Sequence, residues 1–274
     1  MKSSRNVVFV IGIGCSLVAI IAVILLGVTV IKKAKQNNAD ALTPTPVAVE
    51  KATPSPEITR EIVGPSETNI DNRPTIEMTS GPIVIIDPGH GGNDGGTNGN
   101  REERTDEGKH YWECNIALDI SLLVKEKLQN AGVRVVMTRE EDYFCGTVVE
   151  RKEFADSIED AVCYVSIHLN AADDKSITGT EVLYNDNANS DSPVLAKYVL
   201  NGLLDKNGSR DRGLKVRDDL GVLKTQHPSC LVECEFLSAD AKFPLLIDHD
   251  YQDLTAEGIT NGIIKYLDYV GVME

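Results

Sequence analysis

The strongest constraint in this sequence is an apolar run at residues 7–31 that contains no charged side chain. At about 1.5 Å per residue, a helix of this length spans the hydrocarbon core of a bilayer. The run is too long for the apolar part of a signal peptide, and no small-residue cleavage site follows it closely. We therefore expect a retained transmembrane signal anchor at 7–31 after a short cytoplasmic tail at 1–6, although basic residues on both sides leave its orientation open.

The composition changes after this run. Residues 32–81 lose apolar periodicity and are rich in Thr, Pro, Ser and Glu, which is typical of a flexible, disordered linker. From residue 82 onward, strand-like and helix-like segments alternate, which favours a single α/β domain at 82–272. We expect a mostly parallel central sheet covered by helices on both faces. The expected strands are 83–87, 133–138, 161–168, 179–184 and 230–236, and the expected helices are 113–130, 149–158, 193–206 and 253–269.

Charge and cysteine content exclude several classes of function. The formal net charge is -15, and an acidic surface repels the phosphate backbone of nucleic acids. The chain has 6 cysteines but no CxxC pattern, which argues against a disulfide framework and against a thiolate zinc cluster. Nucleic acid is therefore not expected as a partner.

Two histidines stand at the ends of expected strands. His90 lies in a glycine-rich turn just past the first strand, where open α/β sheets tend to place ligand sites, and Asp87 could orient its imidazole. His168 ends a continuous apolar strand of the kind that is buried on both faces. Each also has a structural interpretation, His90 as a surface turn residue and His168 as a hydrogen-bonded core residue.

Two glutamates occupy positions where an apolar side chain would be expected. Glu113 begins an expected helix on the same face as Ile116 and Ile120, so its carboxylate projects toward the core. Glu233 interrupts an otherwise apolar late strand. Burying an unpaired carboxylate is costly, so both positions suggest function. The alternatives are a first-turn glutamate favoured by the helix dipole and an edge-strand glutamate that faces water.

Two imidazoles and one carboxylate form a ligand set that suits Zn²⁺ and leaves a fourth position for water. A further carboxylate then serves as the base. The helical HExxH arrangement does not occur in the sequence. The residues by themselves therefore predict a metal-dependent hydrolase.

A series of motifs runs in order through nearly the whole domain. They are DPGHGGNDGG at 87–96, Glu113 with Leu118, TR..D at 138–142, R...A at 151–155, SIHLNA at 166–171, G.EV.Y at 179–184, RGLKV at 212–216 and LVE.EFLS at 231–238. Taken together they are highly specific. The domain resembles the zinc-dependent N-acetylmuramoyl-L-alanine amidases of the Amidase_3 family.

The resemblance implies that His90, Glu113 and His168 bind Zn²⁺ and that Glu233 is the catalytic glutamate. The implied reaction is hydrolysis of the amide bond between the lactyl group of N-acetylmuramic acid and L-alanine of the peptide stem in peptidoglycan. Glu233 would take a proton from the attacking water and return it to the departing nitrogen. We expect a single-pass protein of the cell membrane whose catalytic domain faces the cell wall. The need for an activating protein partner stays open.

Two other functions stay open at this point. One is an amidase-like domain without catalysis that binds peptidoglycan or a partner protein. The other is a zinc peptidase that acts on the peptide stem. The presence of all three ligands and of Glu233 favours the enzyme over the binding module, and the usual motifs of zinc peptidases are missing.

Three charged residues have more than one interpretation. Glu235 stands where the amidase family usually has glycine, and strand alternation would place it on the same face as Glu233. It could tune the base, repel an anionic substrate or turn outward at the strand end, and we favour the last. Arg139 and Arg151 are interpreted either as binders of peptide carboxylates or as members of core salt bridges.

Overall fold

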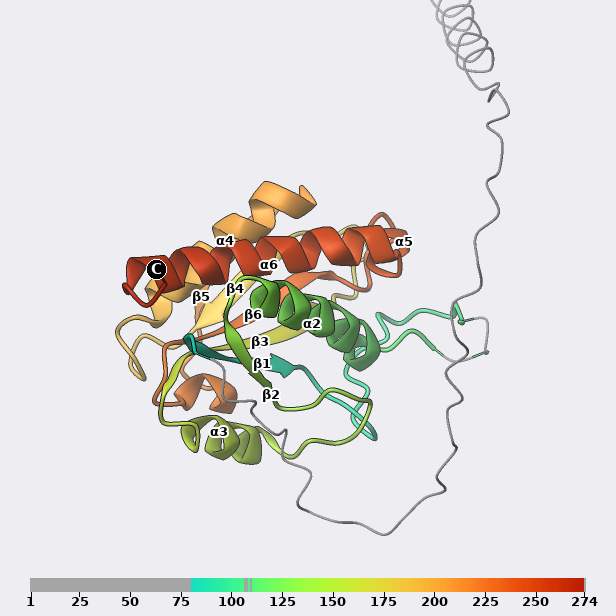
Figure 1. Ribbon diagram of the computed structural model, residues 1–274. Coiled ribbons are helices and arrows are strands. Elements are labelled where there is room, and N and C mark those ends of the chain that lie inside the picture. Colours follow the sequence, from blue (N-terminus) through green and yellow to red (C-terminus); the bar gives the residue numbers. More distant parts are fainter. Residues whose placement is uncertain (1–79, 106–107, 109, 274) are drawn as a thin grey trace, which may run out of the picture. The chain divides into compact units, whose positions relative to one another are not determined.

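The computed structural model describes residues 80–105, 108 and 110–273. These residues form an α/β domain around one six-stranded sheet with the strand order β2-β1-β3-β6-β4-β5 (Figure 1). The expected anchor at 7–31 and almost all of the expected linker lie outside the described residues. No helix within the described ranges is long and apolar enough to cross a membrane.

The sheet is mostly parallel, as predicted. Its neighbouring strands run parallel except for β4 and β6, which pair antiparallel. The edge strand β5 was not expected. The strands are β1 (Ile83–Pro88), β2 (Arg134–Met137), β3 (Ala161–Asn170), β4 (Thr180–Tyr184), β5 (Asp211–Val216) and β6 (Ser229–Phe236). The helices are α2 (Glu113–Asn130), α3 (Val148–Asp156), α4 (Ser192–Asn207), α5 (Phe243–Leu246) and α6 (His249–Tyr269), with a 3-10 turn, η1 (Gly221–Lys224).

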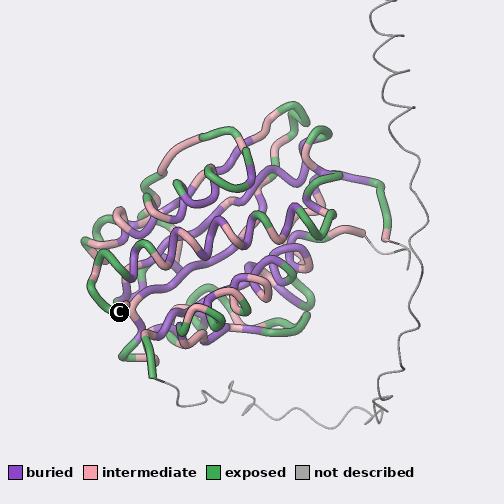
Figure 2. Tube along the Cα trace, turned by 45° about the horizontal axis from the view of Figure 1, so that its top comes forward, coloured by how far each residue is buried: buried purple, intermediate pink, exposed green. Residues whose placement is uncertain are grey.

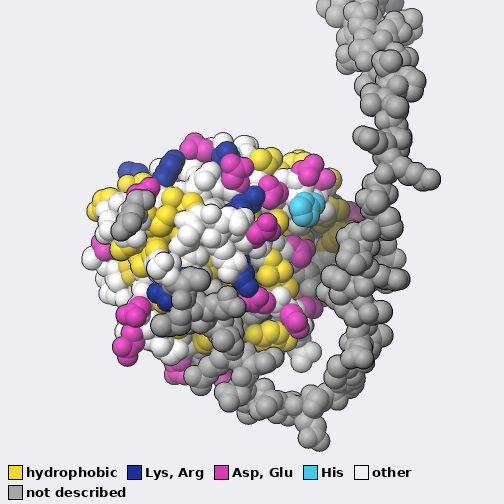
Figure 3. Space-filling view, in the orientation of Figure 1, with side chains coloured by type: hydrophobic (Ala, Val, Ile, Leu, Met, Phe, Trp, Pro, Cys, Tyr) yellow, Lys and Arg dark blue, Asp and Glu magenta, His cyan; other side chains and the backbone are white. Residues whose placement is uncertain are grey.

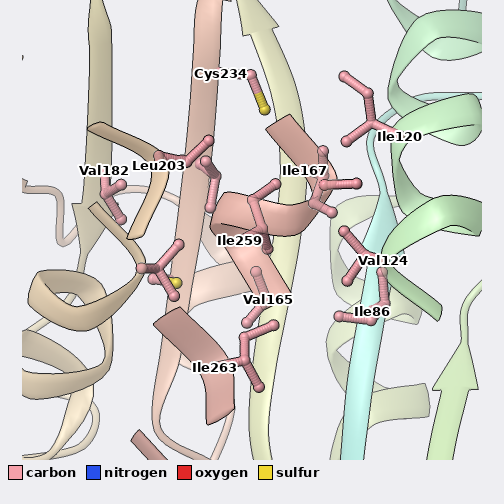
Figure 4. Packing of buried hydrophobic residues seen from close by; sticks show 14 of the residues in the cluster. Ile86, Ile120, Val124, Val165, Ile167, Val182, Leu203, Cys234, Ile259 and Ile263 are labelled. Carbon is pink, nitrogen blue, oxygen red and sulfur yellow. The ribbon is translucent and has the colours of Figure 1, made fainter. Parts of the chain in front are cut away.

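Helices cover both faces of the sheet, which confirms the second part of the fold prediction. In Figure 1, α2, α4 and α6 lie on one side of the strands and α3 lies on the other. Strands β1, β3 and β6 are the most continuously buried strands of the sheet, and Figure 2 shows buried segments running through the middle of the domain. Figure 4 shows aliphatic side chains of the strands packed against helices of the larger layer: Ile86, Val165, Ile167 and Val182 with Ile120, Val124, Leu203, Ile259 and Ile263.

Helix α3 begins with a capping box. The Thr147 side chain accepts a hydrogen bond from the Glu150 amide, and the Glu150 carboxylate accepts one from the Thr147 amide at 2.7 Å. These two bonds satisfy backbone donors that the first turn leaves free. The helix therefore starts at Val148, one residue before the expected position, and its first turn faces the end of β1.

Helices α4 and α6 approach each other through glycines. A Cβ atom built on Gly202 of α4 would lie 2.3 Å from the carbonyl oxygen of Gly258 in α6. A Cβ atom on Gly262 would lie 2.5 Å from the Cα atom of Val199. The two backbones are thus too close for any side chain at these positions, and this contact fixes the outer layer over the sheet.

We predict that Gly202→Ala lowers the free energy of unfolding by about 1 to 3 kcal/mol, because the added methyl group overpacks the helix contact. This loss outweighs the gain of about 1 kcal/mol that alanine normally brings to a helix. Urea denaturation measures the change, with Asn201→Ala at the preceding exposed position as the control. An equal or greater stability of Gly202→Ala would contradict the close contact.

Candidate metal centre and active site

The turn after β1 holds His90 in an unusual backbone conformation. His90 has φ +58°, in the left-handed region that non-glycine residues rarely adopt. Two guanidinium groups bind the carbonyl oxygens of this turn. Arg151 donates to Pro88 at 3.0 Å and to His90 at 2.6 Å, and Arg139 donates to Gly89 at 2.8 Å. These bonds stabilise a conformation that would otherwise cost on the order of 1–2 kcal/mol.

A buried carboxylate anchors the same turn to the sheet. Asp87 pairs with Arg151 at 2.9 Å and accepts hydrogen bonds from Thr138, Tyr164 and Ser166 at 2.6, 2.6 and 2.7 Å. Burial by itself would raise the pKa of Asp87, but the Arg151 charge and the three hydroxyl groups outweigh it, so the pKa lies below its usual value. Asp87 is therefore a charged anchor beneath the turn.

The two arginines have structural roles. Arg151 forms the core salt bridge with Asp87 that was one of its two interpretations. Arg139 is only 1% exposed and donates to backbone carbonyl oxygens, including that of Cys114 at 2.7 Å. Both guanidinium groups are occupied inside the domain, which favours a structural role for each; for Arg139 that role is hydrogen bonding to backbone carbonyl oxygens and not the expected salt bridge.

Glu113 reaches the end of β3 from the first turn of α2. Its carboxylate accepts hydrogen bonds from the backbone amides of Thr97 and Leu169, at 3.0 and 3.1 Å. Burial alone would raise its pKa, but hydrogen bonds from His168 and His90 outweigh that effect and hold the pKa of Glu113 well below its usual range. Glu113 is a buried, ionised carboxylate, as predicted from the face on which it lies.

The structure brings His90, Glu113 and His168 together. One ligand atom from each residue can be chosen so that all three lie within 4.8 Å of one another. Glu113 is 3.3 Å from Nε2 of His90 and 2.8 Å from Nδ1 of His168. Asp94 binds Nδ1 of His90 at 2.9 Å and orients the ring. We had given that orienting role to Asp87, which the salt bridge occupies instead.

The donor set and its surroundings fit a zinc ion. Two imidazoles and a carboxylate are typical zinc ligands, and oriented imidazoles with a hydrogen-bonded carboxylate are the usual support for them. Glycines keep the space open: a Cβ atom on Gly89 would lie 2.4 Å from the His168 ring, and one on Gly96 would lie 2.5 Å from the Glu113 carboxylate. Any side chain at either position would fill the space around the donors.

Glu233 lies beside this cluster. It stands in register with His168 of β3 on one side and with Glu181 of β4 on the other. Its Oε2 atom is buried and makes no hydrogen bond within the described part of the chain. Burial raises the pKa of Glu233 to about 7, with the charges of Glu113 and Glu181 acting in the same direction and that of His168 opposing them. A carboxyl group with this pKa exchanges protons readily near neutral pH.

Glu235 does not turn outward, contrary to our preferred interpretation. A register shift between His168 and Asn170 in the pairing of β3 with β6 breaks the simple alternation of the strand. Glu235 is fully buried, accepts hydrogen bonds from the Gly179 amide and the Ser209 hydroxyl, and lies 3.4 Å from the Lys242 ammonium. It ties β6 to the segments that precede β4 and β5.

Comparison with known proteins gives consistent matches. The profile of the family Amidase_3, described as N-acetylmuramoyl-L-alanine amidase, matches residues 84–265. The germination-specific N-acetylmuramoyl-L-alanine amidase of Bacillus subtilis is 30% identical over 207 residues, which cover 70% of this chain and 82% of that protein. The uncharacterized protein YqiI of Bacillus subtilis is 35% identical over 193 residues, with coverage of 70% and 88%.

Solved structures show the same fold. The crystal structure of N-acetylmuramoyl-L-alanine amidase from Clostridium difficile 630 superposes with a TM-score of 0.63 at 34% identity, covering 70% of this chain and 100% of that chain. The CwlD amidase from Clostridioides difficile, solved in complex with the GerS lipoprotein, gives a TM-score of 0.61 at 32% identity, with coverage of 69% and 99%.

We predict that Asp87→Asn lowers the free energy of unfolding at pH 7 by about 3 to 5 kcal/mol, because it leaves the Arg151 charge buried without its partner. The pKa of Asp87 is lower in the folded than in the unfolded chain. Its charge therefore stabilises the fold above the unfolded pKa of about 4, and this contribution is lost as the pH falls through the folded pKa.

The gap in stability between the unsubstituted chain and Asp87→Asn should therefore narrow as the pH falls below about 4. Urea denaturation at pH 7, 5, 4 and 3 measures the gap, with Asp218→Asn at an exposed position as the control. A gap that stays constant over this range would show that the Asp87 charge does not stabilise the fold.

Proposed function

The chain belongs to the Amidase_3 family of N-acetylmuramoyl-L-alanine amidases, and we propose that it uses zinc to hydrolyse the amide bond between the lactyl group of N-acetylmuramic acid and L-alanine in peptidoglycan. The observation that carries the zinc-dependent mechanism is the convergence of His90, Glu113 and His168 within 4.8 Å. Glu233 lies beside these three residues and would supply the general base and acid of the reaction.

His90, Glu113 and His168 would hold the metal. A zinc ion at such a site supplies a Lewis acid for the amide carbonyl and lowers the pKa of water. Asp94 keeps the imidazole of His90 oriented through its hydrogen bond to Nδ1. The amides of Thr97 and Leu169 keep the Glu113 carboxylate fixed and ionised. The protein thus positions the ligands before substrate arrives.

Glu233 is the proposed proton carrier. Its Oε2 atom has no hydrogen-bond partner within the described residues, so it is free to accept a proton from the attacking water. It then returns that proton to the nitrogen of L-alanine, which must leave as an amine. Burial, which raises the pKa of Glu233 above its usual value, suits a group that acts first as base and then as acid.

We predict that Glu233→Ala lowers the release of L-alanine amino termini from purified peptidoglycan by at least about 100-fold, the usual contribution of a general acid–base group. Bound zinc, measured by elemental analysis, should stay near one ion per chain, because the three ligands are intact. The control is Glu126→Ala, an exposed glutamate on α2.

Treatment with a chelator should abolish the activity and readdition of zinc should restore it. Full activity of Glu233→Ala would refute its role as proton carrier. Stoichiometric zinc without any product from several types of cell wall would instead support a binding module, or an amidase that needs an activating protein partner.

We also propose that the chain is a single-pass protein of the cell membrane with its catalytic domain toward the cell wall. Two facts support this location: the uncharged apolar run at 7–31 and a substrate class that lies outside the membrane. The Thr- and Pro-rich stretch at 32–81 would then connect the anchor to the domain.

Deletion of residues 7–31 should move the protein from the membrane fraction to the soluble fraction. In spheroplasts of cells that carry the full-length chain, added protease should degrade the domain at 82–272, whereas a cytoplasmic marker stays intact. Full-length protein in the soluble fraction, or a domain that is protected from the protease, would contradict the proposed location.

A further inference from the structure

A cleft of about 550 Å³ opens beside His90 and His168, between the start of α3 and the η1 turn. We propose that this α3–η1 cleft binds the N-acetylmuramoyl side of the substrate, with Phe144 and Val148 as its main apolar contacts. The proposal rests on the amidase function proposed above and adds which half of the substrate lies on which side of the metal centre.

The cleft exposes apolar side chains. Phe144 is 51% exposed and Val148 is 49% exposed, and both line the cleft. Leu220, Val222 and Leu231 complete the apolar lining. Exposed apolar surface in a concave site marks a place where a ligand is buried. An aromatic ring and aliphatic groups suit the C–H face of a sugar and the methyl groups of its acetyl and lactyl substituents.

The backbone fixes Phe144 relative to the metal centre. The Gly92 amide donates to Asp142 at 2.8 Å, and a Cβ atom on Gly92 would lie 2.6 Å from the backbone nitrogen of Phe144. The segment that carries Phe144 therefore rests directly on the turn that carries His90. The backbone that carries the aromatic ring is thus placed beside the metal centre before substrate binds, and this preorganisation reduces the entropy lost on binding.

The described lining of the cleft offers no free cation to an anionic ligand. Arg151 is the one basic side chain besides the two histidines in the described lining, and it already binds Asp87 and backbone carbonyl oxygens. Asp94 and Asp219 also face the cleft, where Asp94 binds His90 and Asp219 forms an ion pair with Arg217 at 2.7 Å. The N-acetylmuramoyl group is uncharged while its lactyl carboxyl group is in the amide, whereas the peptide stem carries free carboxylates. The cleft thus matches the glycan side of the scissile bond.

The position of Glu233 restricts where the peptide stem of the substrate can lie. Glu233 must reach the leaving nitrogen, so the peptide stem has to lie on the Glu233 side of the metal centre. Glu233 is on β6, next to β4 and with β5 beyond it, and a charged pair in that direction is Glu181 with Arg212 at 3.0 Å. The acyl half would then extend into the α3–η1 cleft, which opens beside His90 and His168.

The test measures binding of the two halves separately. The proteins are full-length, purified in detergent with zinc, and carry Glu233→Ala so that nothing is cleaved. The glycan probe is the disaccharide N-acetylglucosaminyl-N-acetylmuramic acid with its lactyl group as a methylamide, and the peptide probe is the free stem tripeptide. Isothermal calorimetry gives a Kd for each probe.

Adding Phe144→Ala should weaken binding of the disaccharide roughly tenfold, since it removes most of an apolar ring contact. Binding of the tripeptide should change less than about twofold. Val148→Thr replaces an exposed side chain with one of similar shape. It should also weaken binding of the disaccharide, by a smaller factor, and it serves as a second variant if Phe144→Ala is misfolded. Val149→Ala is the matched control, because Val149 is 58% exposed but does not line the cleft.

Unchanged binding of the disaccharide in both cleft variants, or a loss confined to the tripeptide, would overturn the proposal. The proposed function fails in a different way, when the unsubstituted chain with zinc releases no L-alanine amino termini. The binding assay does not depend on turnover, so the two failures are distinguishable.

Discussion

The site depends on a buried ion pair between Asp87 and Arg151. Asp87 ends the first strand, and Arg151 lies on α3, so the pair joins the sheet to the smaller helix layer. The same guanidinium group holds the carbonyl oxygen of His90, whose backbone is left-handed. Without these bonds the turn would relax toward a common conformation and move the imidazole away from Glu113. The charge that stabilises the fold therefore also places the first of the three candidate metal ligands.

The parallel part of the sheet explains why distant residues meet. β1, β3 and β6 are neighbours and run parallel, so their carboxyl ends share one edge and bring His90, His168 and Glu233 together there. Glu113 comes from the first turn of α2, where the helix start faces the same edge. Glu113 and His168 are thus fixed by secondary structure, whereas His90 lies in the turn after β1, where Asp94 orients its ring.

The sequence was sufficient to predict the features that produce a local pattern of residues. Apolar periodicity and the odd placement of His90, Glu113, His168 and Glu233 predicted the main strands and the cluster. β5 was missed because an edge strand that is largely exposed has no apolar run. The interpretation of Glu235 was wrong because a register shift within β6 cannot be seen in strand alternation. The sequence could not decide the roles of Arg139 and Arg151, because a buried arginine and an arginine that binds substrate look the same in a sequence.

The charge of the chain restricts how the substrate can be held. The formal net charge is -15, and acidic side chains are spread over the face in Figure 3 instead of forming one patch. A peptide stem with free carboxylates gains little from long-range attraction to such a surface. Binding must then come from short-range contacts: the metal centre at the scissile bond and apolar burial around Phe144. Of these, only apolar burial favours the uncharged glycan half, which is why the exposed ring beside His90 carries the proposed orientation.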